Sequence, residues 1–578
     1  MSQVSLRPVQ AEVNHGDRVL SHPFAGGLNS PQFQTSDLDG DGDLDLVVLD
    51  RSTSSISCFE NIEESYSFNP EMSHSFPIDL QHWFVLADYD CDGIKDLFTF
   101  TNLGIRVFKH TIQNQKSAWT LIEEPLTYQN EDSEVNIFLN SSDLPAISDA
   151  DNDGDLDLLS FNFSNSSRIE FYKNYSIENG GACGLDFKRE TTSYGNILDC
   201  GCDHFVAADD CDSGGRILHI GGKTILSTDL SGDGLQDLIL SQEDCGNLSF
   251  TINEGTSKQP LFSEITLSIP DQTSTLDANF FPASFLEDIN FDGKKDLIVA
   301  SNDRSNPSET IDFAQSAMVY LNTGAIGNQT FSAGVPFLQD QMIDVGEAAY
   351  PAIADINLDG LPDLVIGNRS SLIDGERVSS LTYYESNGSE LSLVTKDLFE
   401  LSKLGLKHIN PQFVDLNNDG FLDLFFSTED RLARKIFYFL LSEQGTFDYS
   451  NARSMDFPTF YFQDYVLDDL DRDGIYEILI GLFSGRLDVY QTSFPVWPAA
   501  FTVKEEGFLS ISGDTDRGYP SLTTGDLDQD GDMDLITSNE SGVVQFYSNF
   551  RSGNANAQSE IITFDQGETV QNTRFSST

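Results

Sequence analysis

Short apolar runs recur along the chain, each directly after an acidic stretch. Runs such as DLVVL at 45–49, DLFTF at 96–100 and DLVIG at 363–367 are rich in branched and aromatic residues, which is typical of buried strands. The next segment alternates apolar and polar residues, as in RIEFYKN and RLDVYQT, and this period of two predicts a half-buried strand. A more variable strand-like segment usually follows, and no long amphipathic helix is predicted.

The acidic stretches share the pattern Asp-x-(Asp/Asn/Ser)-x-Asp-Gly-x-x-(Asp/Glu)-(Leu/Ile). Nine copies occur at a mean spacing of about 61 residues, and no other period is present. The copies begin at Asp37, Asp88, Asp149, Asp229, Asp288, Asp355, Asp415, Asp469 and Asp526. The repeats leave no room for a separate catalytic domain.

Each repeat therefore predicts one four-stranded antiparallel sheet, and the chain is expected to be all-β. We predict a single β-propeller over residues 31–550, with about nine blades and each acidic loop between the first two strands of its blade. Since propellers usually have four to eight blades, eight or seven blades are alternatives, and a solenoid is the competing architecture.

The termini are expected to frame this propeller. Residues 1–30 form an N-terminal segment in which Arg18–Phe24 is the candidate ring-closing outer strand, with Ile561–Phe564 as the competing closer. Residues 551–578 are expected to be a tail or linker.

The acidic loops have the composition of calcium sites. Carboxylates at positions 1, 3 and 5 can converge when the loop curls, glycine at position 6 permits the turn, position 7 offers its backbone carbonyl, and position 9 adds an acid. Position 12 lies within a strand and is never glutamate, which excludes an EF-hand. Ser231, at position 3, is the weakest donor. Calcium, up to nine ions, is the predicted cofactor.

The candidate ligands are Asp37, Asp39, Asp41, Asp43, Asp45, Asp88, Asp90, Asp92, Ile94, Asp96, Asp149, Asp151, Asp153, Asp155, Asp157, Asp229, Ser231, Asp233, Leu235, Asp237, Asp288, Asn290, Asp292, Lys294, Asp296, Asp355, Asn357, Asp359, Leu361, Asp363, Asp415, Asn417, Asp419, Phe421, Asp423, Asp469, Asp471, Asp473, Ile475, Glu477, Asp526, Asp528, Asp530, Asp532 and Asp534. The alternative is that these Asp-Gly loops are only hairpin turns. Nine loops that all keep acids at positions 1, 5 and 9 favour ion binding, because carboxylates this close repel one another.

Charge restricts the partners. The chain has 93 acidic and 32 basic residues among 578, a formal net charge of −61. Nucleic-acid binding needs clustered Lys and Arg, so a nucleic-acid partner is excluded, and docking on anionic lipid is disfavoured. No apolar run approaches the roughly 20 residues of a membrane helix. The first 16 residues lack the apolar core of a signal peptide, so the chain is either cytoplasmic or lacks its leader.

The repeated core over residues 31–550 resembles the FG-GAP and VCBS repeats of integrin-α-type and bacterial cell-surface propellers. The Phe-Gly and Gly-Ala-Pro ends of integrin repeats are mostly absent, so the bacterial variant is the closer resemblance. Segments such as GGLNSPQFQTSDLDGDGDLDL are similar to secreted Bacteroidetes proteins of type IX secretion, which often carry a C-terminal sorting domain. The resemblance implies calcium-binding loops, an extracellular or cell-surface location, and a binding or scaffold role.

Seven cysteines are present, and five of them, Cys183, Cys200, Cys202, Cys211 and Cys245, surround a long insertion at about 178–224. We predict at least one disulfide among these five, with free thiols or structural zinc as alternatives. The odd count leaves at least one cysteine free.

Two classes of function remain. The first is a secreted or surface calcium-binding propeller for adhesion or for interaction with an unknown protein or carbohydrate. The alternative is a propeller enzyme such as a calcium-dependent polysaccharide lyase. The eight histidines are scattered and no His-Glu-x-x-His, Gly-x-Ser-x-Gly or Gly-Lys-Ser/Thr motif occurs, so no catalytic residue is assigned and the binding module is favoured.

Overall fold

Antiparallel sheets make up the protein, and the helices are single short turns such as α1 (Pro70–Ser73) and α2 (Ser176–Gly180). This computed structural model describes residues 5–6, 11–131, 133–164, 166–209, 211, 221–243, 245–268, 280–306, 311–324, 329–373, 375–429, 435–455, 457, 462–470, 473–496, 500–508, 520–525, 533–538, 544–547 and 563–564. The all-β prediction is confirmed. Among these residues, no helix has the length and apolar character needed to cross a membrane.

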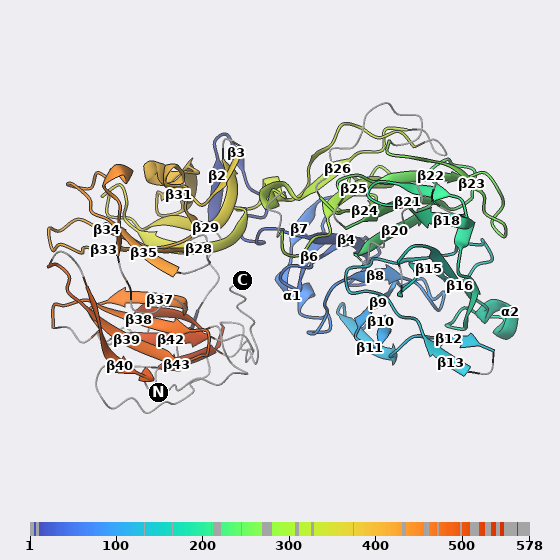
Figure 1. Ribbon diagram of the computed structural model, residues 1–578, viewed down its shortest axis with the longest axis horizontal. Coiled ribbons are helices and arrows are strands. Elements are labelled where there is room, and N and C mark those ends of the chain that lie inside the picture. Colours follow the sequence, from blue (N-terminus) through green and yellow to red (C-terminus); the bar gives the residue numbers. More distant parts are fainter. Residues whose placement is uncertain are drawn as a thin grey trace. The chain divides into compact units, whose positions relative to one another are not determined.

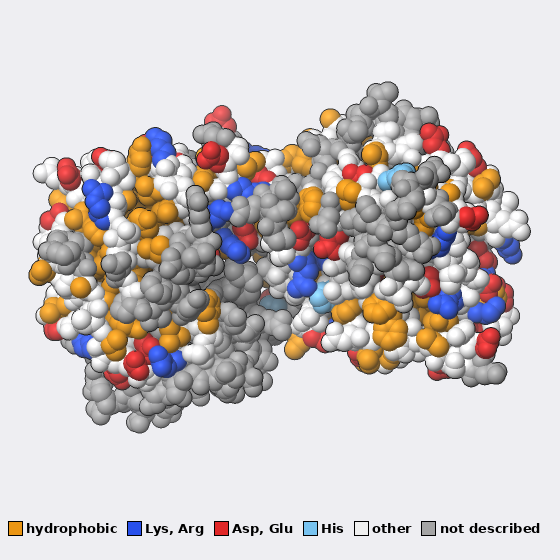
Figure 2. Space-filling view, in the orientation of Figure 1, with side chains coloured by type: hydrophobic (Ala, Val, Ile, Leu, Met, Phe, Trp, Pro, Cys, Tyr) orange, Lys and Arg blue, Asp and Glu red, His pale blue; other side chains and the backbone are white. Residues whose placement is uncertain are grey.

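The chain divides into two compact units (Figure 1). The first unit is Ser21–Asp344, and the second combines Met1–Leu20 with Val345–Thr578. The first contains five of the nine acidic motifs and the second contains four. Acidic, basic and hydrophobic side chains are interspersed on the face of both units shown in Figure 2.

Five sheets of the first unit each carry one motif between their first two strands. These sheets are β4 (Pro31–Ser36) to β7 (Tyr66–Phe68) with β5 (Asp45–Asp50) and β6 (Ser55–Asn61); β8 (Phe84–Ala87), β9 (Asp96–Thr101), β10 (Gly104–Ile112) and β11 (Ser117–Glu123); β14 (Ala146–Ser148), β15 (Asp157–Phe161), β16 (Ile169–Asn174) and β17 (Phe187–Thr191); β20 (Lys223–Thr228), β21 (Asp237–Gln242), β22 (Ser249–Asn253) and β23 (Phe262–Thr266); and β24 (Pro282–Glu287), β25 (Asp296–Ser301), β26 (Ala317–Tyr320) and β27 (Val335–Pro336).

Smaller strands extend this set. The β12 (Thr127–Asn130) and β13 (Ser133–Asn136) hairpin adds to β17, and β18 (Ile197–Asp199) pairs with β19 (Phe205–Ala207).

The second strand of each of these sheets follows the acidic loop and is buried, as its apolar run predicts. All six residues of β5, β21 and β25 are buried. The third strand is more buried than its alternation predicts, and β16 is buried along its whole length. The reason is that both faces of a sheet pack on neighbouring sheets: one apolar cluster combines β5 with β8 and β9, another β15 and β16 with β21.

The first strands of the five sheets contact one another in a cycle. β4 contacts β8, β8 contacts β14, β14 contacts β20, β20 contacts β24, and β24 returns to β4. The last contact includes a hydrogen bond of 2.6 Å from Thr35 Oγ1 to Glu287 Oε2 and an edge-to-face contact of Phe33 with Phe285 at 5.9 Å. The fifth sheet of the chain therefore packs beside the first.

This packing corrects the prediction of a single ring of about nine blades. In such a ring the first sheet would lie between the second and the last sheets of the whole chain. Here the place beside β4 is taken by β24, and the chain continues into a separate compact unit. The prediction of four-stranded sheets with one motif each does not depend on this count.

Buried Arg51 ties several sheets of the first unit together. Its guanidinium donates to the backbone carbonyls of His82, Asn302 and Ser141, the last at 3.1 Å. These carbonyls precede β8, follow β25 and precede β14. Burial and then the nearby Arg304 lower the pKa of Arg51 to about 9, which leaves the side chain charged at neutral pH.

The second unit continues the repeat with four more sheets, whose first strands contact in chain order. They are β28 (Glu347–Ala354), β29 (Asp363–Ile373), β31 (Leu381–Ser386) and β32 (Glu390–Thr395), with β30 (Glu376–Val378) on β29; β33 (Lys407–Val414), β34 (Asp423–Glu429), β35 (Lys435–Leu440) and β36 (Arg453–Met455); β37 (Phe462–Asp468), β38 (Glu477–Leu482), β39 (Leu487–Thr492) and β40 (Phe501–Glu506); and β41 (Ser521–Gly525), β42 (Asp534–Ser538) and β43 (Val544–Tyr547).

The N-terminal segment belongs to the sixth sheet rather than the last. β2 (Glu12–His15) pairs in parallel with β32, and β3 (Arg18–Val19) pairs with β2. We expected the Arg18–Phe24 stretch to form an outer strand that completes the final blade. The stretch does contain an outer strand, β3, but this strand belongs to the sixth sheet. Of the competing closer at 561–564, the described residues form β44 (Thr563–Phe564), which pairs with β1 (Ser5–Leu6).

Three disulfides confirm the cysteine prediction. Cys200–Cys211 and Cys202–Cys245 both join members of the predicted group. A third, Cys91–Cys183, links positions 92 residues apart and was not predicted. Cys58 is the free cysteine, and its burial raises the pKa of the thiol to about 12.

Candidate metal centres in the acidic loops

Position 1 organises each acidic loop. In eight loops its carboxylate accepts a hydrogen bond of 2.8–3.1 Å from the N–H of the position 6 glycine. That glycine has a positive φ, for example 97° at Gly42 and 104° at Gly154, a conformation that glycine adopts without strain. Position 4 is also left-handed, as at Cys91 (56°) and Asn152 (59°). The loop therefore curls around the position 1 carboxylate.

Position 9 closes the loop onto the sheet. In the first loop, Asp45 Oδ2 accepts from the N–H of Leu38 and Oδ1 accepts from the N–H of Asn61 on the third strand, both at 2.9 Å. The bond to position 2 recurs in eight loops at 2.9–3.3 Å, and the bond to the third strand recurs in seven at 2.7–2.9 Å. Sequence reasoning assigned position 9 only a ligand role and missed this structural one.

Burial raises the pKa of several position 9 carboxyls. The pKa rises to about 6 at Asp45 and Asp423, about 7 at Asp96 and about 8 at Asp157. Desolvation is the largest cause, and neighbouring loop carboxylates raise each pKa further, against the backbone hydrogen bonds that lower it. In these four loops the ionised form of the position 9 carboxyl is therefore costly, and a bound cation would relieve that cost.

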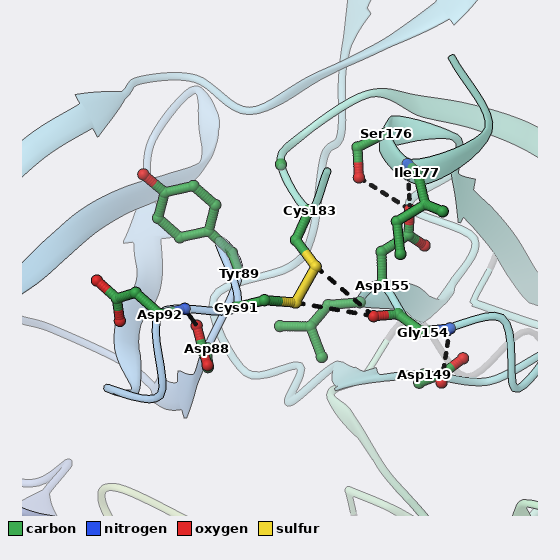
Figure 3. Close-up of a disulfide and its surroundings, with 12 residues drawn as sticks. Asp88, Tyr89, Cys91, Asp92, Asp149, Gly154, Asp155, Ser176, Ile177 and Cys183 are labelled. Carbon is green, nitrogen blue, oxygen red and sulfur yellow. Dashed lines mark hydrogen bonds between the residues drawn. A yellow bond between two sulfur atoms is a disulfide. The ribbon is translucent and has the colours of Figure 1, made fainter. Parts of the chain in front are cut away.

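The position 7 side chain differs between loops. Asp43 is exposed, whereas Asp155 accepts hydrogen bonds from Ser176 Oγ at 2.8 Å and from the Ile177 N–H at 3.1 Å, which caps α2 (Figure 3). The N–H of position 7 binds the position 5 carboxylate, at 2.9 Å between Asp43 and Asp41. That position 7 offers only its carbonyl as a ligand stays a prediction.

Three loops bring carboxylates to one point. Ligand atoms of Asp37, Asp39 and Asp41, positions 1, 3 and 5 of the first loop, lie within 4.8 Å of one another. In the second and third loops the same limit holds for positions 1, 3 and 9, namely Asp88, Asp90 and Asp96, and Asp149, Asp151 and Asp157. These donors are hard oxygens, the type calcium prefers.

Several of these oxygens are buried without a hydrogen-bond partner. They include the Oδ1 atoms of Asp90, Asp151 and Asp153. A buried carboxylate oxygen with no donor is costly, so these residues fit a cation in chemical type.

The fourth to seventh loops keep the same backbone with weaker donors at position 3. Asn417 Oδ1 accepts from the Asp419 N–H at 2.9 Å, and Asn357 donates its amide to Glu385 at 2.9 Å. Ser231 Oγ is buried without a hydrogen-bond partner. In the eighth loop Asp471 lies outside the described residues, as do 526–532 of the ninth, which contain Asp526, Asp528, Asp530 and Asp532.

Among the described residues, lysines contact the carboxylates of four loops, which sequence reasoning missed. Lys294 pairs with Asp292 at 3.1 Å and Lys504 with Glu477 at 2.7 Å, and in two further loops a lysine bridges two carboxylates. Lys109 Nζ contacts Asp90 and, at 3.0 Å, Asp92; Lys173 Nζ contacts Asp151 at 2.5 Å and Asp153. The hydrogen bonds that Lys109 donates to Asp90 and then to Asp92 raise its pKa. The available signal was the lysine at the end of the alternating third strand.

The unpredicted disulfide joins the second acidic loop to the segment after α2, beside the third acidic loop. Cys91 is position 4 of the second loop, and Cys183 follows α2 (Figure 3). Both sulfurs approach the carbonyl of Gly154, position 6 of the third loop, at 3.8 and 3.7 Å. Asn152, at position 4 of that loop, donates to the Gly234 carbonyl of the fourth at 2.7 Å. Adjacent loops therefore lie side by side.

Two other clusters are weaker candidates for a metal site or a catalytic site. Cys202 and Cys245 lie with Asp203, but their sulfurs form a disulfide, which removes the thiolates that zinc needs. Tyr350, His408 and Glu429 form a chain in which His408 Nε2 contacts the tyrosine hydroxyl and Nδ1 lies 3.0 Å from Glu429. Burial raises the pKa of Tyr350, so its hydroxyl stays protonated and is a poor general base.

Comparison with known proteins identifies the repeat. The FG-GAP-like repeat family matches residues 37–99, 288–366 and 355–426. The chain therefore contains FG-GAP-like repeats in these three regions. No curated protein matches the chain.

Similar solved structures include a lectin of Agrocybe aegerita that recognises non-reducing terminal N-acetylglucosamine, at 16% identity and a TM-score of 0.27, covering 69% of this chain and 92% of the lectin. Another is the Tc holotoxin pore of Photorhabdus luminescens, at 12% identity and a TM-score of 0.22, covering 87% of this chain and 22% of that one.

Proposed function

We propose that the protein is a secreted or cell-surface calcium-binding propeller protein that acts as an interaction module for a protein or carbohydrate partner. The observation that carries the calcium proposal is the convergence of Asp37, Asp39 and Asp41 within 4.8 Å. No ion pair from the described residues neutralises these three carboxylates, which supports a bound cation as their partner. The pKa of Asp39 is raised, chiefly by burial and also by its acidic neighbours, so the ionised carboxylate is costly without a cation.

The first unit is proposed to be a closed five-bladed propeller. Support comes from the cycle of contacts among β4, β8, β14, β20 and β24 and from the apolar clusters between successive sheets. A propeller holds its acidic loops on a common side, which suits a calcium-stiffened binding surface.

An extracellular location is supported by three disulfides, since such bonds persist in oxidising compartments. FG-GAP-like repeats support the interaction role. The acidic composition makes a nucleic-acid partner implausible on physical grounds.

Isothermal titration calorimetry tests the calcium proposal. Calcium added to decalcified protein should give saturable binding that Asp37→Asn reduces and Asp43→Asn, at an exposed position of the same loop, leaves nearly unchanged. No saturable heat would overturn the proposal. A glycan array and a pull-down from surface extracts, each in calcium and in chelator, test the interaction role, which predicts a partner lost on chelation.

A further inference from the structure

Two acidic loops of the first unit contain an ammonium group between their carboxylates. Lys173 Nζ lies 2.5 Å from Asp151, in contact with Asp153, and 3.0 Å from Glu178. The lysine side chain is 11% exposed, and those of Asp151 and Asp153 are 8% and 16% exposed. An ammonium has three protons, so these three carboxylates use its full hydrogen-bonding capacity.

The second loop repeats this arrangement. Lys109 Nζ contacts Asp90 and lies 3.0 Å from Asp92. In both loops the lysine therefore bridges positions 3 and 5, which the calcium proposal counts as ligands. Position 5 is also absent from the converging sets of these two loops, which consist of positions 1, 3 and 9.

One strand position supplies this lysine. Lys109 and Lys173 each directly precede the residue whose N–H binds the position 9 carboxylate, His110 and Asn174. The equivalent residues of the other loops, found by the same hydrogen bond, are Glu60, Ile252, Leu321, Glu385 and Leu441. The residue at this strand position is therefore a lysine in the second and third loops and a glutamate in the first, although all three loops have the same acidic motif.

We propose that Lys109 and Lys173 are internal cations, so that the second and third loops do not fill with calcium at concentrations that fill the first. This inference rests on the proposed calcium function of the acidic loops. The ammonium neutralises positions 3 and 5 without metal. The partnerless oxygens Asp90 Oδ1 and Asp151 Oδ1 belong to the same carboxylates that bind lysine, so a calcium ion there would lie next to the ammonium.

Repulsion between the two cations sets the expected effect. A divalent ion and an ammonium about 4 Å apart repel enough, even at the dielectric of water, to weaken binding roughly thirtyfold. In the first loop Glu60 takes the lysine's place and adds a negative charge instead. The first loop should therefore bind calcium more tightly than the other two.

Equilibrium dialysis with radioactive calcium tests the proposal on the full chain. In the wild type, Asp37→Asn should remove one tight site, whereas Asp88→Asn and Asp149→Asn should remove none. The double variant Lys109→Met with Lys173→Met should gain two tight sites. Its melting temperature should fall in chelator, because the loop carboxylates lose their partner, and recover in calcium. Lys188→Met is the matched control, since Lys188 pairs with Glu190 at 2.7 Å outside any acidic loop.

The outcomes separate this inference from the calcium proposal. Loss of a tight site in Asp88→Asn or Asp149→Asn would overturn the internal-cation role while leaving calcium binding intact. An unchanged count in a folded lysine double variant would overturn it as well. If the double variant does not fold, the three single aspartate variants still decide. A wild type without any tight calcium site would overturn the proposed function itself.

Discussion

Replacing Asp45 by Asn separates the structural role of position 9 from metal binding. Both carboxylate oxygens of Asp45 accept backbone N–H groups, from Leu38 and Asn61 at 2.9 Å each, and the side chain is buried. An asparagine has only one acceptor oxygen. Whichever way it is oriented, its amide nitrogen must face one of the two N–H groups.

The cost follows from that mismatch. A hydrogen bond to a charged group contributes about 1.5–3 kcal/mol, and leaving its buried partner unsatisfied costs about 1–3 kcal/mol. The relief of carboxylate burial, which raises the pKa of Asp45 to about 6, offsets part of this. We expect a loss of about 2–3 kcal/mol in the free energy of unfolding of the first unit, or roughly 3–5 °C in melting temperature.

Urea denaturation in chelator is the assay, because without calcium only the hydrogen bonds are tested. Asp43→Asn is the matched control: it makes the same chemical change in the same loop at an exposed position, so its stability should change by less than about 0.5 kcal/mol. If the two variants are equally stable in chelator, and Asp45→Asn loses stability only in calcium, the position 9 side chain is a ligand and not a structural link.

Further predictions address the ligand set, pH, redox state and the centre of the first unit. Asp41→Ala should lower calcium affinity far more than Asp43→Ala, and calorimetric titration that finds equal losses would contradict the assignment of positions 5 and 7. In chelator the folded protein retains protons on Asp157 and Asp96, whose pKa values are about 8 and 7, whereas the unfolded chain releases these protons near pH 4. The free energy of unfolding should therefore rise as the pH falls from about 8 to 5. Denaturation of Asp157→Asn over the same pH range should show a smaller rise. Mass spectrometry of non-reduced peptides should find Cys91–Cys183, and Cys183→Ser should cost about 2–5 kcal/mol when the variant and the wild type are denatured without reductant. Arg51→Met leaves three buried carbonyls without their donor and should destabilise the first unit by about 3 kcal/mol, whereas a neutral result in thermal melts would contradict its linking role.

The sequence was sufficient for the sheets and the loops because both are local. The acidic motif specifies a curled turn through Asp37 and Gly42, and the apolar run after it specifies a buried strand, so the position of each sheet follows from nearest neighbours. The contact that closes the first unit joins Thr35 to Glu287, 252 residues away. The interval from Asp288 to Asp355 crosses the boundary between the two units, but it is not the longest interval between motifs. The spacing of the motifs therefore did not indicate that the chain divides into two units.

The lysines illustrate a different limit. Lys109 and Lys173 occupy the same strand position as Glu60, and the alternating pattern marks that position as polar without saying what it faces. Only the register between the third strand and position 9 brings the side chain into the loop. The sequence could reveal the lysine, but its role required the hydrogen bonds around Asp96 and Asp157.

Scanning calorimetry in calcium, magnesium and chelator tests the central claim, that the acidic loops are calcium sites which stabilise the folded repeats. A ligand that binds only the folded state adds about 2.7 kcal/mol per site at a hundredfold excess over its Kd, and the sites will not add fully because adjacent loops are in contact. The melting temperature should fall clearly in chelator and recover in calcium more than in magnesium, whose strict octahedral geometry suits these loops poorly. Equal melting temperatures under all three conditions would show that the loops are acidic turns and not calcium sites.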